Sequence, residues 1–306
     1  MNRTFLKPLL LAITVISMAF GACAHPVPQA KQFPPKVKAF SQVDTVQVMS
    51  MAMGRTIKNV VVMPETYGNV RYLLMRYPVV YLLHGASGCY SDWSRKADLE
   101  ELANEYGVII VCPDGQDSWY FDSPIDPTMQ FETYVSKELV EYIDNHYRTH
   151  ANRYMRAITG LSMGGHGSLL LAFRHPDVFW SCGSMSGCMN ITRFPDNWHI
   201  KDRLGEYKDN KQQWEEHAVY NQLDKVKAST LKPAQNIIID DGLKDIFYPQ
   251  NVAMHELLVE KEIDHDFIIR PGAHTWTYWV NALDYHFVFF SKAFARGTKL
   301  MQQEQP

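Results

Sequence analysis

Short apolar runs alternate with longer amphipathic stretches along most of this chain. The runs 78–83 and 107–112 are continuously apolar, which predicts strands buried on both faces. In the segment 131–147 an apolar residue recurs at every fourth position, which predicts a helix with one buried face. Further strands are expected at 154–159, 178–185, 235–240 and 265–270, and further helices at 98–106, 166–175 and 249–261.

The order of these elements predicts the fold class. The segments 42–49 and 56–63 flank Met53-Gly54-Arg55 and predict an antiparallel hairpin at the entry to the domain. After the hairpin, strands and helices alternate, which is typical of an α/β fold with a mostly parallel central sheet and helices on both faces. The polar segment 188–223 breaks the alternation. We expect an insertion there, either over the functional site or as a surface excursion without a substrate role.

One turn between a strand and a helix carries the strongest chemical signal. Gly160-Leu161-Ser162-Met163-Gly164 separates the strand 154–159 from the helix 166–175. G-x-S-x-G in this context is typical of a nucleophile elbow, in which small residues permit a sharp turn that exposes the serine. The N-terminus of the following helix favours developing negative charge. Ser162 is therefore the candidate nucleophile, and a glycine-rich turn without chemistry is the alternative.

A serine nucleophile needs a base and an acid that orients the base. His274 follows the last predicted strand, at the edge of an open α/β sheet where catalytic residues collect. Asp245 lies on the loop after the strand 235–240 and is the candidate acid. Asp240 and Asp241 are rivals for that role, although carboxylates at a strand end more often cap the loop backbone.

The oxyanion-binding groups are expected from backbone amides. His84-Gly85-Ala86-Ser87-Gly88 follows the strand 78–83 with small residues, so its N–H groups are able to face a substrate. In elbow enzymes one donor comes from this early loop and the other from the residue after the nucleophile. We assign the N–H groups of Ala86 and Met163.

Together these segments resemble the esterase D and feruloyl esterase branch of the α/β-hydrolases. The matching stretches are YPVVYLLHGASG from Tyr77, DSWYFDS from Asp117, GLSMGG from Gly160, DGLKD from Asp241 and PGAHTWTYW from Pro271. The resemblance implies the α/β-hydrolase fold, the triad Ser162, Asp245 and His274, and the oxyanion donors Ala86 and Met163. The branch includes carbohydrate feruloyl and acetyl-xylan esterases, tributyrin-type esterases, S-formylglutathione hydrolases and mycolyltransferases. The tryptophans after His274 look more like the carbohydrate esterases.

Aromatic residues near the predicted strand ends are candidate substrate contacts. Trp119, Tyr120 and Trp276 are assigned to this role, and Trp198 and Trp214 of the insertion are expected near the same site. Flat aromatic faces suit sugar rings or a phenolic acyl group. The alternative for each is an ordinary place in the core.

The N-terminus has the features of a targeting segment. A basic start and the short apolar run 9–20 lead to Ala22-Cys23-Ala24, which predicts a signal peptide at 1–24. Cys23 also stands in a degenerate lipobox, so a lipoprotein anchored there is the alternative. Residues 25–41 are expected to be a flexible lead-in and residues 297–306 a C-terminal tail, on either side of an esterase domain at 42–296.

Composition narrows the function further. The chain has 306 residues, 46% of them hydrophobic, and a formal net charge of −3, which gives no sign of nucleic-acid binding. No phosphate-binding loop or Cys/His metal cluster is present in the sequence, so we expect no cofactor and no metal. Export permits disulfides, and Cys182 and Cys188 are close enough in sequence to pair.

The sequence thus predicts an exported serine ester hydrolase that cleaves acetyl or feruloyl esters of plant polysaccharide or oligosaccharide through an acyl-enzyme. An acyltransferase of the mycolyltransferase kind and a broad short-chain esterase are alternatives, and a non-catalytic carbohydrate-binding relative is a remote one. The expected partner is a small-molecule or oligosaccharide ester, with no membrane-spanning segment and an open oligomeric state.

Overall fold

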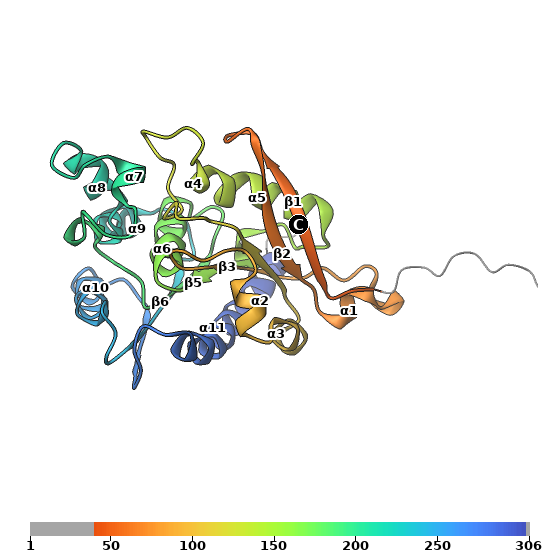
Figure 1. The fold of residues 1–306 in the computed structure, drawn as a ribbon. Coiled ribbons are helices and arrows are strands. Elements are labelled where there is room, and N and C mark those ends of the chain that lie inside the picture. The colour runs from red at the N-terminus through yellow and green to blue at the C-terminus, as the bar shows by residue number, and fades with distance from the viewer. Residues whose placement is uncertain (1–39, 304–306) are drawn as a thin grey trace, which may run out of the picture. The chain divides into compact units, whose positions relative to one another are not determined.

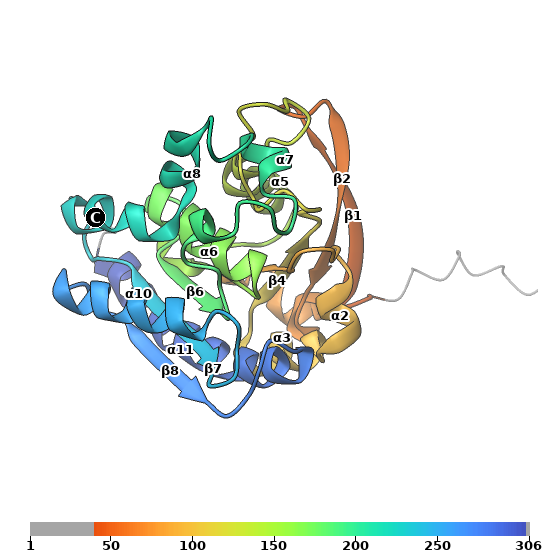
Figure 2. The same cartoon turned by 60° about the vertical axis from the view of Figure 1, so that its left-hand side comes forward.

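The computed structural model describes residues 40–303, so the expected signal peptide, Cys23 and all but the end of the lead-in lie outside the described residues. Within them, eight strands form one sheet in the order β1-β2-β4-β3-β5-β6-β7-β8 (Figures 1 and 2). The strands are β1 Val43–Ser50, β2 Arg55–Val62, β3 Val79–Leu83, β4 Ile109–Pro113, β5 Arg156–Gly160, β6 Ser181–Met185, β7 Asn236–Gly242 and β8 Asp266–Arg270.

The sheet is antiparallel only at one edge. Strands β1 and β2 form the expected hairpin, and β2 pairs antiparallel with β4. All pairs from β4 through β3 to β8 are parallel. The prediction of a mostly parallel sheet of the α/β-hydrolase kind is confirmed. The α-helices are α1 Glu65–Gly68, α2 Asp92–Lys96, α3 Leu99–Tyr106, α4 Phe131–Thr133, α5 Leu139–His146, α6 Met163–Arg174, α7 Lys201–Leu204, α8 Lys211–His217, α9 Leu223–Ala228, α10 Tyr248–Glu260 and α11 Trp276–Gln303.

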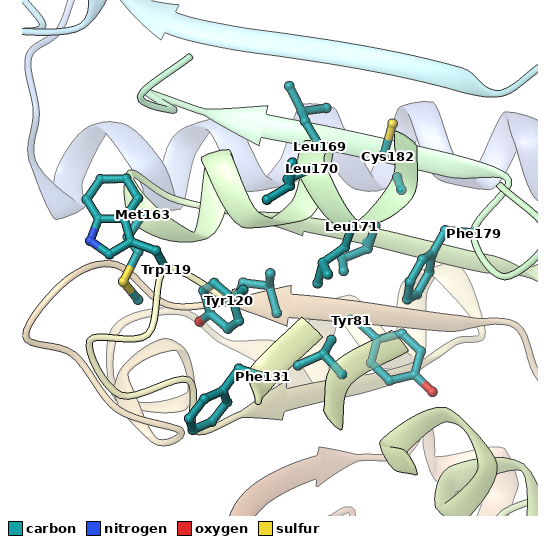
Figure 3. Packing of buried hydrophobic residues seen from close by; sticks show 14 of the residues in the cluster. Tyr81, Trp119, Tyr120, Phe131, Met163, Leu169, Leu170, Leu171, Phe179 and Cys182 are labelled. Carbon is teal, nitrogen blue, oxygen red and sulfur yellow. The ribbon is translucent and has the colours of Figure 1, made fainter. Parts of the chain in front are cut away.

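Apolar layers cover both faces of the sheet. Successive side chains of a strand point to opposite faces, so Tyr81 of β3 joins the layer beneath α5, α6 and α10, whereas Val80 and Leu82 join the layer beneath α3 and α11. Figure 3 shows the first layer, in which leucines of α6 pack near Tyr81 and Phe179. Burial on both faces explains why the strand sequences are continuously apolar.

The predicted helix 131–147 is present in three parts. Helices α4 and α5 are joined by a π-helical segment, η2 Tyr134–Glu138. Apolar residues spaced by four drift around an ideal α-helix, which has 3.6 residues per turn. The wider π turn offsets this drift, so Phe131, Val135, Leu139 and Ile143 all stay buried on one side.

The expected C-terminal tail is wrong in part. Helix α11 runs from Trp276 to Gln303, so residues 297–303 are helical. Its buried side chains recur at helical spacing, with Trp279, Leu283, Phe287 and Phe290 facing the sheet. Trp276, expected on a loop, is the first residue of this helix.

The segment 188–223 consists of short helices separated by turns and irregular loops. It contains α7, α8 and the short 3₁₀ turns η4 Ile191–Arg193 and η5 Val219–Gln222. Trp214 is fully buried and donates its Nε1–H to the Gly205 carbonyl oxygen at 2.9 Å. The expectation that Trp214 lies near substrate is therefore wrong, because its ring fills the core of the segment.

Cys182 and Cys188, which are close enough in sequence to pair, are both free and are buried in the same apolar layer. Cys182 lies near the start of β6 and Cys188 lies beyond its end. Within residues 40–303, no helix has the length and apolar character needed to cross a bilayer.

Close backbone packing fixes the turn between β5 and α6. A methyl group added at Gly164 would lie 2.6 Å from the carbonyl oxygens of Leu83 and His84, and one at Gly160 would lie 2.6 Å from that of Leu83. Backbone atoms cannot swing aside as side-chain ends do. Glycine at these two positions lets the turn approach the end of β3.

We predict that Gly164→Ala lowers the free energy of unfolding by about 3 kcal/mol, because the new methyl group overlaps backbone of β3. Gly54→Ala is the matched control: Gly54 has φ of +64° but no atom near the added methyl group, so it should cost about 1 kcal/mol. Urea unfolding of both variants measures the difference. An equal or smaller loss for Gly164→Ala would contradict the close-packing argument.

Candidate active site

Ser162 occupies a strained turn at the start of α6. Its φ of 54° and ψ of −115° lie outside the regions favoured by residues with a side chain. Its N–H donates to the Met185 carbonyl oxygen at 2.9 Å, which ties the turn to the end of β6. Strain of this kind is found where a fold holds a reactive side chain in place.

His274 links Ser162 to Asp245. Its Nε2 lies 2.9 Å from Ser162 Oγ, and its Nδ1 lies 2.9 Å and 3.0 Å from the two carboxylate oxygens of Asp245. In neutral imidazole a proton on Nδ1 faces the carboxylate, which leaves Nε2 to accept the hydroxyl proton of Ser162. The three residues predicted from the sequence are therefore connected by hydrogen bonds, from Ser162 through His274 to Asp245.

The loops that carry the acid and the histidine are bound to one another. The N–H of Leu243 donates to the Arg270 carbonyl oxygen at 2.9 Å, and that of Lys244 donates to Gly272 at 2.8 Å. These bonds extend the β7–β8 ladder beyond the strands. The Asp245 carboxylate is buried and accepts the N–H of Phe247 at 2.8 Å, so it is held toward His274.

The structure separates the two rival carboxylates from the histidine. Asp240 pairs with Arg270 at 2.5 Å and accepts the hydroxyl proton of Tyr278 at 2.5 Å. Asp241 is buried and accepts the N–H of the adjacent Gly242 at 2.8 Å. Burial, followed by the nearby Asp245 carboxylate, raises the pKa of Asp241 to about 8.

The expected oxyanion donors lie at the base of the site. Ala86 lines the cleft beside Ser162, and Met163 begins α6, where an N–H has no carbonyl partner within the helix. The Ala86 loop is held by Asp117, whose Oδ1 accepts the N–H of Ser87 at 2.5 Å. The sequence reasoning missed Asp117 as a positioning residue, although its motif DSWYFDS was the available signal.

Ser162 opens into a cleft of about 610 Å³. Three tryptophans line it: Trp198 comes from the inserted segment, and Trp276 and Trp279 come from α11. The lining is completed by Gly85, Ala86, Ser87, Gly88, Asp92, Leu161, His274 and Thr275. Of the three aromatic residues assigned to substrate from sequence, the structure places Trp276 in this cleft.

The assignment of Trp119 and Tyr120 to substrate contact is wrong. Trp119 is 1% exposed and Tyr120 is 0% exposed, and both pack in the apolar layer that Figure 3 shows. Their polar atoms form hydrogen bonds to the backbone of residues in or next to the cleft wall. Trp119 Nε1–H donates to the Trp198 carbonyl oxygen at 2.9 Å, and the Tyr120 hydroxyl donates to that of His84 at 3.1 Å.

A serine, an aspartate and a histidine in this chain order, with the histidine hydrogen-bonded to both of the others at the carboxyl edge of a mostly parallel sheet, define the class of α/β serine hydrolases. Residues 50–290 match the model of the Esterase family, described as "Putative esterase". The chain belongs to this family, and the activity that the family supports is ester hydrolysis. The resemblance to the esterase D and feruloyl esterase branch is thereby confirmed.

Individual relatives differ in their reactions. An acetyl esterase of Caldicellulosiruptor saccharolyticus is 26% identical over 70% of this chain and 83% of its own length. The diacylglycerol acyltransferase/mycolyltransferase Ag85B of Mycobacterium leprae is 33% identical over 59% of this chain and 52% of its own. The serine hydrolase FphF of Staphylococcus aureus shares the fold, with a TM-score of 0.73 at 22% identity, covering 81% of this chain and 98% of its own.

We predict that Asp241→Asn changes how stability depends on pH. The folded protein keeps a proton on Asp241 up to about pH 8, whereas the unfolded chain releases it near its ordinary value of 3.8. The wild type therefore loses stability relative to Asp241→Asn as the pH rises through this window. Thermal unfolding of both proteins across the window measures the effect. A difference in Tm that stays constant with pH would contradict a protonated Asp241.

Proposed function

We propose that this protein is an exported serine carboxylic ester hydrolase that works through an acyl-enzyme. The observation that carries the proposal is the hydrogen-bonded series Ser162, His274 and Asp245 at the base of an open cleft. The basic, apolar and small-residue sequence pattern at 1–24 supports the proposed export. The paired histidine and carboxylate also favour an enzyme over a non-catalytic carbohydrate-binding relative.

The reaction uses each group in turn. Ser162 Oγ attacks the ester carbonyl carbon while His274 Nε2 takes its proton, and Asp245 stabilises the imidazolium that forms. His274 then gives this proton to the leaving alcohol, which leaves an acyl group on Ser162. A water molecule, deprotonated by the same histidine, attacks the acyl carbon and restores the serine.

Charge on the substrate oxygen is balanced by the backbone. The tetrahedral oxyanion is expected to accept hydrogen bonds from the N–H groups of Ala86 and Met163, the second of which is at the positive end of α6. Each such donor typically contributes about 3 kcal/mol to lowering the barrier. Because Asp117 holds the loop of Ala86, this donor is set before substrate arrives.

The cleft wall favours an acylated saccharide as substrate. Trp198, Trp276 and Trp279 line the cleft that contains Ser162, and aromatic side chains suit contact with sugar rings or with an aromatic acyl group. The acetyl esterase among the relatives and a solved ferulic acid esterase with the same fold, at a TM-score of 0.70, are in keeping with acetyl or feruloyl esters. Acetyl or feruloyl esters of plant polysaccharide fragments are the proposed substrates.

An acyltransferase is the second candidate, favoured by the 33% identity to a mycolyltransferase. It would use the same acyl-enzyme but pass the acyl group to a sugar hydroxyl instead of water. Product analysis with and without added oligosaccharide distinguishes them. A hydrolase releases free acid at the same rate with and without the added oligosaccharide, whereas a transferase forms a new sugar ester and releases less free acid when the oligosaccharide is present.

We predict that Ser162→Ala lowers kcat for a soluble acetyl ester on the order of 10⁶-fold and Asp245→Asn by about 10⁴-fold, through loss of the nucleophile and of the correct histidine tautomer. Asp241→Asn and Asp240→Asn are the matched controls, since neither carboxylate bonds to His274, and each should retain activity to within about tenfold. Steady-state kinetics on folded variants measure this. If Asp241→Asn proves as damaging as Asp245→Asn, the acid is misassigned.

We also predict that Trp198→Ala and Trp276→Ala each raise KM for acetylated xylan oligosaccharides by about tenfold, because a stacked ring is lost, and change kcat for a small acetyl ester little. Wild-type kcat/KM should be higher for the oligosaccharide or for methyl ferulate than for a long-chain triglyceride. A clear preference for the triglyceride would overturn the saccharide assignment while leaving the serine hydrolase proposal intact.

A further inference from the structure

The segment 69–76, between α1 and β3, exposes apolar side chains that the proposed reaction does not use. Leu74 is 97% exposed, Val70 77% and Leu73 57%, and Tyr72 and Met75 are also exposed. We call these five residues, with Arg71 and Arg76, the 69–76 patch. Single exposed apolar residues are ordinary, but a contiguous group marks an interaction surface.

The patch is anchored where it meets the sheet. The N–H of Tyr77 donates to the Arg148 carbonyl oxygen at 2.8 Å, and the N–H of His150 donates to that of Tyr77 at 3.1 Å. The Arg76 guanidinium donates to the Thr149 carbonyl oxygen at 2.9 Å. The Tyr77 side chain is fully buried, so the chain is held immediately after the patch while the patch itself faces solvent.

Both charged side chains of the patch are positive. The patch includes Arg71 and Arg76 but no aspartate or glutamate, the preceding carboxylate in the sequence being Glu65, and neither arginine makes an ion pair among residues 40–303. The sequence before Phe40 adds lysines and no acidic residue, since the first carboxylate of the chain is Asp44. Phe40 itself packs on Tyr67 of α1, with ring centroids 6.1 Å apart, so the chain enters the described structure next to the patch.

We propose that the 69–76 patch docks this protein on the surface of an anionic lipid bilayer. The apolar side chains would enter the boundary between headgroups and acyl chains, and the arginines would lie among the lipid phosphates. A second copy of this chain fits less well. Symmetric contact of two such patches would bring their arginines together without any carboxylate between them.

This docking leaves the cleft free. The patch precedes β3 and lies at the amino end of the parallel strands, whereas Ser162 follows β5 at the carboxyl end, with Leu83 of β3 opposite Gly160 of β5. The two surfaces are therefore at opposite edges of the sheet. Sixteen residues lie between Cys23 and Phe40, a length that spans at most about 60 Å, so a lipid on Cys23 and the patch are able to engage one bilayer.

The test uses exported protein carrying Cys23→Ser, which cannot be lipidated. It is sedimented with vesicles of phosphatidylethanolamine containing phosphatidylglycerol, and with phosphatidylcholine vesicles as the neutral comparison. We expect binding to the anionic vesicles that weakens with salt. Leu73→Ser/Leu74→Ser and Arg71→Gln/Arg76→Gln should each weaken binding by about tenfold or more.

Met51→Ser/Val259→Ser is the matched control, because it removes exposed apolar side chains elsewhere, at 82% and 58% exposure, and should bind as the parent does. Thermal unfolding and hydrolysis of a soluble ester, expected to be unchanged in all three variants, verify the fold. Absence of binding to anionic vesicles would overturn the proposal. The proposal would also fail if Lys31→Gln/Lys36→Gln/Lys38→Gln abolished vesicle binding while the two patch variants left it unchanged. It would fail too if the protein bound no vesicles but formed a dimer that Leu73→Ser/Leu74→Ser disrupts.

Discussion

The contact between the turn at Ser162 and the end of β3 is the constraint on which the rest of the site depends. Gly160 and Gly164 allow the turn to approach the carbonyl oxygens of Leu83 and His84 more closely than any side chain permits. That approach sets the nucleophile beside the loop of Ala86, so the serine and the proposed oxyanion donors come from neighbouring parallel strands. The positive φ of Ser162 follows from the same packing and is maintained by the buried sheet on which the turn rests.

The second half of the site is built independently and meets the first through His274. Strands β7 and β8 continue their ladder past their ends, which holds the loops of Asp245 and His274 at a fixed separation. Asp240 pairs with Arg270 and Tyr278, so the charge nearest these loops is compensated without recruiting the histidine. Burial and the nearby Asp245 carboxylate raise the pKa of Asp241, which disfavours a second negative charge next to the imidazole.

Features that depend on local pattern were predictable from the sequence. The apolar runs predict the parallel sheet. Ser162, Asp245 and His274 each follow a predicted strand, and the carboxyl ends of parallel strands lie at the same edge of the sheet, so the sequence predicts that the three residues meet. The substrate wall was not predictable in the same way. Trp119 and Tyr120 are buried in a loop whose positive φ values no sequence pattern indicates, and Trp198 lines the cleft from a segment without a regular apolar period. The end of α11 was missed although its apolar spacing is helical.

The central claim is that Ser162 is activated by His274 and forms a covalent intermediate. Intact-protein and peptide mass spectrometry after treatment with a fluorophosphonate probe tests it most directly, because such probes react with a serine only when a neighbouring base has activated it. The account predicts one adduct, on the peptide that contains Ser162, formed far more slowly in folded His274→Ala. A folded wild-type protein that takes no adduct, or takes it on another residue, would contradict the account.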